Sequence, residues 1–160
     1  MRPKDLILSN YNNMVNIFHQ ESDRGAAVLA GSYVENLLGS YLIYCMKDKS
    51  VEEKVFSSNG PLSTFSQRID IAQAFGYIDK KSAKRLDLIR KIRNHFAHHP
   101  FDASFDDSPV KDWASNLSSL LDWKDEHKII SDAMTPRISY LVNCGYFCAI
   151  THVKMAGVDL

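Results

Sequence analysis

The sequence has no long hydrophobic run. None of its apolar stretches approaches the roughly 20 residues that a membrane-spanning helix needs, and the apolar part of the N-terminal "MRPKDLILSN" is too short for a secretory signal. Hydrophobic residues make up 45% of the chain and charged residues 24%, as is typical of a soluble globular protein. We therefore expect a cytoplasmic protein that has no membrane segment.

An excess of charge of either sign is also missing. The chain carries 19 basic and 19 acidic residues, so its formal net charge is zero. Proteins that bind duplex DNA by its backbone usually have a basic excess, because neutralised phosphates and released counterions supply much of the affinity. The overall charge gives no support to direct DNA binding, although it leaves room for a local basic surface.

Cysteine is scarce as well. The three cysteines, Cys45, Cys144 and Cys148, form no CxxC pair, and their odd number argues against a disulfide framework. Cys144 and Cys148 lie four residues apart in an apolar stretch. We expect them to be buried thiols.

Apolar residues recur at helical spacing along most of the chain. Helices are expected over roughly 7–18, 22–46, 64–76, 79–99, 108–121 and 135–153, whereas 122–134 is ambiguous. Several polar residues stand where they could cap these helices: Ser22 or Asp23, Thr64 with Gln67, Asp79, Ser108 and Thr135. The sequence thus predicts an all-α fold, a single domain over residues 1–160 built as a bundle of about five to seven helices.

The stretch "RKIRNHFAHHP", Arg90 to Pro100, gathers the residues that could do chemistry. Pro100 should end a helix, since the residue before a proline is pushed out of the α region. His95, His98 and His99 could approach one metal ion only if the helix continued through His99, and no nearby cysteine completes a zinc set. We expect no metal site and no cofactor, and the other interpretation is histidines at a helix C-terminus, where positive charge is favoured.

A basic run overlaps this stretch. Most of its members avoid the apolar stripe on a helical wheel: Lys84, Arg85, Arg90, Lys91 and Arg93. Two interpretations stay open. The run is either a solvated face that pairs with the acidic loop after it, or a surface for a nucleic acid or a protein partner.

Three residues of the stretch form a possible catalytic unit: Arg93, Asn94 and His98. Arginine can stabilise a phosphate or an oxyanion with its fork of donors, and histidine can accept or donate a proton near neutral pH. Asn94 and His98 share a helix edge, whereas Arg93 and His98 lie about 140° apart on an ideal wheel. The set would suit metal-independent RNA cleavage, but a purely structural role explains the same spacing.

Three blocks carry a family resemblance. The segments "GPLSTFSQRIDIAQAFGYI", "LIRKIRNHFAHHP" and "SFDDSPVKDWASNL", in this order, resemble the mannitol operon repressor family (MtlR/MltR) of bacterial cytoplasmic proteins. The resemblance covers roughly residues 20–155. It implies an all-helical negative regulator of mannitol uptake and catabolism genes, which lacks a recognised DNA-binding motif and acts through protein partners or an atypical nucleic-acid surface.

The segment "RNHFAH" also resembles the RN-x3-H signature of the HEPN superfamily of helical domains, many of which are dimeric RNases or toxin components. Arg93, Asn94 and His98 match its arginine, polar and histidine positions, and Glu35 is a possible acidic partner of Arg93. The resemblance implies a homodimer in which two motifs face each other. It keeps open the alternative of an endoribonuclease, or of an RNA-binding or nucleotide-binding module.

Overall fold

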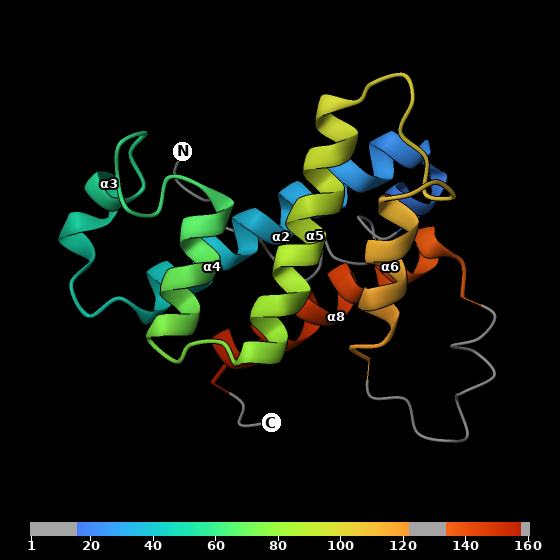
Figure 1. Ribbon diagram of the computed structural model, residues 1–160. Helices are drawn as coiled ribbons and strands as arrows, with labels where there is room; N and C mark the ends of the chain where they lie inside the picture. The colour runs from blue at the N-terminus through green and yellow to red at the C-terminus, as the bar shows by residue number, and fades with distance from the viewer. Residues whose placement is uncertain (1–15, 122–133, 158–160) are drawn as a thin grey trace.

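Helices make up all the regular structure that the computed structural model describes, over residues 16–121 and 134–157 (Figure 1). Within these ranges the elements are α2 (Asp23–Cys45), η1 (Lys49–Val51), α3 (Glu52–Val55), α4 (Phe65–Ala74), α5 (Lys80–His98), α6 (Val110–Ser118) and α8 (Pro136–Met155). Residues 16–20 are helical as well. The prediction of an all-α bundle is therefore confirmed. Residues 7–15 of the helix expected over 7–18, and residues 122–133 of the ambiguous segment 122–134, lie outside the described residues.

Short polar side chains cap the N-termini of four of these helices, at the positions that the sequence predicts. The hydroxyl of Ser22 accepts a hydrogen bond from the third residue of α2, and the carboxylate of Asp79 accepts one from the third residue of α5. Thr64 and Gln67 form the predicted capping box of α4, each side chain bonding the other's backbone N–H. The hydroxyl of Thr135 caps α8. Each bond satisfies a backbone donor that has no partner inside its helix.

Helix α6 begins differently from the prediction. Its first helical residue is Val110 rather than Pro109, and no side chain caps it. The hydroxyl of Ser108 instead donates to the Asp112 carboxylate at 2.6 Å. The expected cap was wrong because a carboxylate one turn along the helix competes for the same hydroxyl group.

The long helices pack against one another around one core. Helix α2 contacts α4, α5 and α8, while α6 packs against both α5 and α8; Figure 1 shows α5 lying across the middle of this arrangement. The core includes fully buried side chains from each of these five helices: Leu37 and Leu38 of α2, Ala72 of α4, Ile89, Ile92 and Phe96 of α5, Leu117 of α6 and Tyr140 of α8. Cys144 and Cys148 are buried as expected, and Cys45 is half-buried.

A glycine sets the closest approach of α2 to its neighbours. A Cβ atom at Gly31 would lie 2.6 Å from the Cβ of Arg93 on α5 and 2.7 Å from the hydroxyl of Tyr140 on α8. That hydroxyl donates a 2.7 Å hydrogen bond to the backbone carbonyl of Ala27. The three helices thus meet at one residue without a side chain, directly beside the motif arginine.

None of the helices in the described ranges combines the length and the apolar character that crossing a bilayer requires.

Candidate functional site

The motif residues Arg93, Asn94 and His98 occupy the last two turns of α5, which ends at His98 as the proline predicts. The backbone N–H of His99 closes the helix by donating to the carbonyl of His95 at 2.9 Å. Asn94 is half-buried and His98 is exposed. The motif therefore begins inside the bundle and ends at its surface.

Arg93 is held by Glu35. Its guanidinium donates through Nη2 to Glu35 Oε2, and each side chain is about one-fifth exposed. This is the pairing expected from the sequence, between α5 and α2. The stem of Arg93 lies against Gly31, and its buried Nε has no hydrogen-bond acceptor among the residues that the structure describes. The guanidinium thus acts as a brace between two helices and is not a freely moving cation.

A second arginine, which the sequence analysis missed, completes the cluster. Arg68 of α4 is 4% exposed, and its Nη1 lies 4.0 Å from Glu35 Oε1. It also donates to the backbone carbonyls of Leu62 and Glu35, at 2.9 and 3.3 Å. A signal for its burial exists in the sequence, because it follows Phe65 by three residues and therefore lies on the core side of α4.

The charges of this cluster do not cancel. Two arginines surround one carboxylate, which leaves one positive charge in a partly buried setting. Burial lowers the pKa of Arg68; the Glu35 carboxylate opposes that shift and Arg93 adds to it. The Arg68 guanidinium lies 5.1 Å from the centre of the Phe56 ring, and that of Arg93 lies 5.7 Å from the Phe65 ring, so aromatic faces share the stabilisation.

His98 stands apart from this cluster. Among the described residues no hydrogen bond or ion pair links it to Arg93, Asn94 or Glu35. The helix explains the separation, because five residues advance the chain by about 7.5 Å and turn it by about 140°. The structure brings the arginine and its acidic partner together and leaves the histidine at the surface.

The other two histidines of the stretch pair with each other. The rings of His95 and His99 stack at 4.2 Å, and His99 Nδ1 lies 3.0 Å from the carbonyl of His95. The ring of Trp113 meets His95 edge-on at 6.0 Å. Burial, and then the neighbouring His99, lower the pKa of His95. Across the described ranges, no group of three or more His, Cys, Asp or Glu residues is arranged to hold a metal ion.

The exposed residues at the end of α5 include His98, His99 and Phe101, which we call the α5 tip. Phe101 is 93% exposed, more than any other large hydrophobic side chain of the described residues. The loop after it carries the exposed carboxylates of Asp102, Asp106 and Asp107. The sequence analysis did not single out Phe101, because spacing does not distinguish an apolar residue in a loop that is buried from one that is exposed.

Most of the residues predicted to form a basic surface are buried or paired with carboxylates in the structure. Arg85 was expected on it, but this residue is only 3% exposed. Its Nε donates to Asn143 Oδ1 at 2.9 Å and its Nη2 to the Leu120 carbonyl at 2.8 Å, while the Tyr146 ring covers the guanidinium at 4.3 Å. The prediction was wrong because Arg85 lies seven residues before Ile92, two full turns along the same buried face.

The remaining basic residues differ in their surroundings. Arg90 and Lys91 both pair with Asp87, at 2.6 and 3.0 Å. Burial raises the pKa of the Asp87 carboxyl, but the hydrogen bonds from these two cations outweigh it and leave that pKa below its usual range. Lys84 is exposed. With Arg93 bound to Glu35, the five basic residues form no continuous positive surface.

Comparisons of this chain with protein-family models, with curated proteins and with solved structures return no match. What the site can do therefore follows from its own geometry. It combines an internal brace of two arginines and one glutamate with an exposed tip that is aromatic and carries imidazoles.

Proposed function

We propose that this chain is a non-enzymatic regulatory protein of the mannitol repressor type, and that it acts through a protein partner that binds the α5 tip. The observation that carries the proposal is the contrast between two residues of one helix end. Arg93 is bound to Glu35 inside the bundle, whereas the Phe101 ring is 93% exposed. The mannitol genes enter through the sequence resemblance described above.

The state of Arg93 favours binding over catalysis. Stabilising a phosphate would require its guanidinium to exchange the Glu35 carboxylate for the substrate, which breaks the partly buried ion pair that joins α5 to α2. The stem of Arg93 has no room to swing toward α2, because it already lies against Gly31. The motif arginine is best explained as the support of the helix end.

The charges near the site favour a protein over a nucleic acid. Arg90 and Lys91 share the Asp87 carboxylate, and Arg85 is internal. A strip of DNA or RNA phosphates would meet isolated cations and the acidic loop after Phe101, which repels it. The counterion release that drives nucleic-acid affinity would be small here.

Phe101 has the properties of an interface anchor. A phenylalanine that stays in water forgoes about 1.5–3 kcal/mol of burial free energy, which a partner's apolar pocket can recover. Aromatic residues dominate the binding energy of many interfaces. The neighbouring Asp102, Asp106 and Asp107 suit a pocket with a basic rim, where opposite charges speed association.

The test measures mannitol-gene transcripts in the source organism after deletion of the gene and its replacement by variants. Deletion should raise the transcripts, and Phe101→Ala should raise them as far while the protein remains folded and equally abundant. Phe75→Ala is the matched control, since this ring is 67% exposed on the turn before α5, at the other end of that helix. It should repress like wild type. Unchanged transcripts in the deletion strain would refute the regulatory function, and full repression by Phe101→Ala would refute the tip as its binding surface.

Direct repression is tested separately with purified protein and a mannitol-operon promoter fragment over a range of salt concentrations. The proposal expects no mobility shift even at low salt. A shift whose affinity falls steeply with salt would show that the chain contacts phosphates itself.

One observation favours a second candidate, a metal-independent endoribonuclease of the HEPN type. The imidazole of His98 is exposed, and Asn94 lies on the same helix edge, so an RNA strand could reach both. Single-stranded RNA should then be cleaved in EDTA by the wild type and not by His98→Ala. Equal cleavage by both proteins, or cleavage by neither, rejects this activity.

A further inference from the structure

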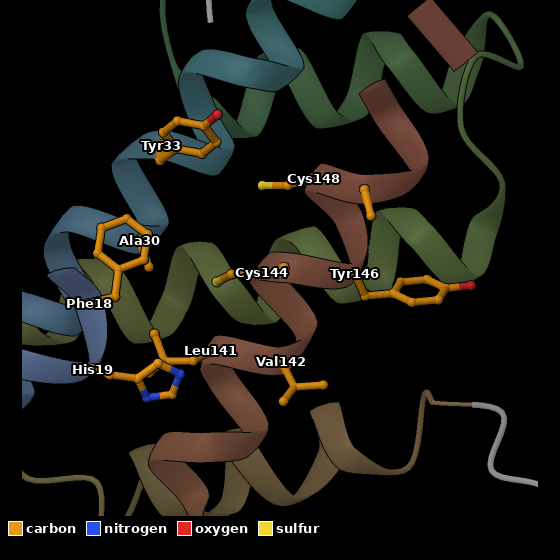
Figure 2. Close-up of a pocket in the computed structure, with 11 residues that line it drawn as sticks. Phe18, His19, Ala30, Tyr33, Leu141, Val142, Cys144, Tyr146 and Cys148 are labelled. Atoms are coloured by element: carbon orange, nitrogen blue, oxygen red, sulfur yellow. The ribbon is translucent and has the colours of Figure 1, made fainter. Parts of the chain in front are cut away.

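A groove lies between α2 and α8. It has a volume of about 420 Å³, and its lining is mostly apolar. Figure 2 shows Ala30 and Tyr33 contributed by α2 and Leu141, Cys144 and Cys148 by α8, with both cysteines directed toward α2. Among the described residues that line it, none belongs to α5. The groove is therefore distinct from the α5 tip.

Small residues leave this space open between the two helices. Ala30 lines the groove from α2, and on α8 a single row lines it, in which Gly145 follows Leu141 by four residues and Cys148 follows Gly145 by three. Protein interiors are normally packed as densely as organic crystals. A space of this size beside the core is therefore a feature that needs an explanation.

The groove reaches down to core residues. Phe18, Ala30, Cys144 and Cys148 all line it, and all four are buried. The flat face of another protein would cover the rim without touching these residues, whereas a small molecule can reach them. Mostly apolar clefts of roughly 300–1,000 Å³ are typical of small-molecule sites. The depth of the groove thus favours a small ligand.

The groove offers no compensation for a charged ligand. Across the described part of the chain, no Asp, Glu, Lys or Arg residue lines it. Burial raises the pKa of Cys148 to about 12 and holds that of Cys144 well above its usual value, so both thiols are neutral. An ion that entered would lose its hydration without meeting an opposite charge. A neutral ligand is therefore favoured.

The groups on the two walls suit an aromatic ring. The rings of Phe18 and Tyr33 lie on one side, and the sulfur atoms of Cys144 and Cys148 point toward them from the other (Figure 2). Ring pairs in offset or edge-on contact are stabilised beyond their buried area, and polarisable sulfur makes favourable contacts with ring edges. A flat ligand can make both kinds of contact at once.

We propose that the groove between α2 and α8 is a binding site for a neutral aromatic compound of one or two fused rings. The ligand lies between the rings of Phe18 and Tyr33 and the two thiols of α8, and it replaces water over apolar surface. This inference goes beyond the proposed function and does not depend on it, since the α5 tip takes no part in the site.

The first test uses the wild-type chain, so that no variant has to fold. The probe is indole, and its matched control is indole-3-carboxylate, which has the same two rings and adds one negative charge. In a titration followed by NMR, indole should shift the backbone amides around Gly145 saturably, with a Kd below about 1 mM. Indole-3-carboxylate should bind at least about tenfold more weakly.

The second test fills the groove. Gly145→Leu places a side chain in the middle of the α8 row that lines it, and should weaken indole binding at least about tenfold because the space is taken. The control is Ala156→Leu, which adds the same side chain at an exposed position just after the end of α8. It should bind indole like wild type, and circular dichroism should show that both variants are folded.

Several results would overturn the proposal. They are the absence of saturable shifts up to about 5 mM indole, equal affinity for the two compounds, and undiminished binding by a folded Gly145→Leu. A wild-type mass of two chains in light scattering that falls to one chain in Gly145→Leu would also overturn it, because the groove would then be an interface between two copies.

Discussion

Replacing Gly31 by alanine tests how the helix crossing supports the Arg93 brace. The added methyl group would lie 2.6 Å from Arg93 Cβ, 2.7 Å from its Cγ and 2.7 Å from the Tyr140 hydroxyl. All three atoms belong to side chains held at the crossing, and Tyr140 is fully buried. The helices must therefore separate, or the hydrogen bond from Tyr140 to the Ala27 carbonyl must break.

The change in the free energy of unfolding that Gly31→Ala causes is the sum of opposing effects. Overpacking of a well-packed core costs about 1–3 kcal/mol, and leaving the buried hydroxyl without its acceptor would cost about 1–3 kcal/mol. Alanine in place of glycine within a helix returns about 1 kcal/mol. We expect a net loss near 2 kcal/mol in the free energy of unfolding, which lowers the Tm of a protein of this size by about 4–8 °C.

The matched control lies on the same helix, at Gly25. The three atoms nearest to a methyl group there all belong to the exposed side chain of Glu21, and the closest of them, at 2.5 Å, is a carboxylate oxygen at the flexible end of that side chain. Gly25→Ala should leave the Tm unchanged or raise it, whereas Gly31→Ala should lower it in thermal unfolding followed by circular dichroism. If Gly31→Ala is at least as stable as wild type, the close approach of α2 to Arg93 and Tyr140 does not exist as described.

Three further predictions concern other parts of the bundle. Arg85→Ala should cost about 2–4 kcal/mol in urea unfolding, because two buried acceptors lose their donor, whereas Arg90→Ala should cost less than about 1 kcal/mol, because its ion pair with Asp87 is only partly buried. Burial and a stacked imidazole lower the pKa of His95, so the folded state resists its protonation. Stability should therefore fall as the pH drops below about 6.5, and His95→Gln should lose less Tm between about pH 7.5 and 5.5; an equal loss refutes the role of this ring. Burial raises the pKa of Cys148 to about 12, so a thiol reagent should modify the half-buried Cys45 first, and rapid reaction of all thiols would contradict this.

The sequence predicted helix caps and helix ends well, because they depend on residues that are only a few positions apart. Thr64 and Gln67 form their capping box, and Asp79 caps α5, because these bonds join residues only three apart. The end of α5 at His98 follows from Pro100 in the same way. Ser108 is an exception, because its hydroxyl, which was expected to cap α6, donates to the Asp112 carboxylate instead.

Partners far apart in the sequence were harder to predict. The pairing of Arg93 with Glu35 was expected from the order of the helices, but the second arginine on the same carboxylate, Arg68, was not. Arg85 was assigned to a basic surface because its charge suggested solvent. Its burial became possible only where Asn143 and the Leu120 carbonyl, 58 and 35 residues away, supply acceptors for its donors.

The sequence by itself determined that the chain is helical and where most of its helices begin and end, because the apolar period and the caps act within a few residues. Only the tertiary structure decided which charged side chains are paired or buried inside the bundle. It placed Arg93 and Arg68 around Glu35, took Arg85 into the interior, and left Phe101 in water. The physical reason is that the cost of burying a charge depends on the partners that other helices bring to it, and one helix taken alone does not contain that information.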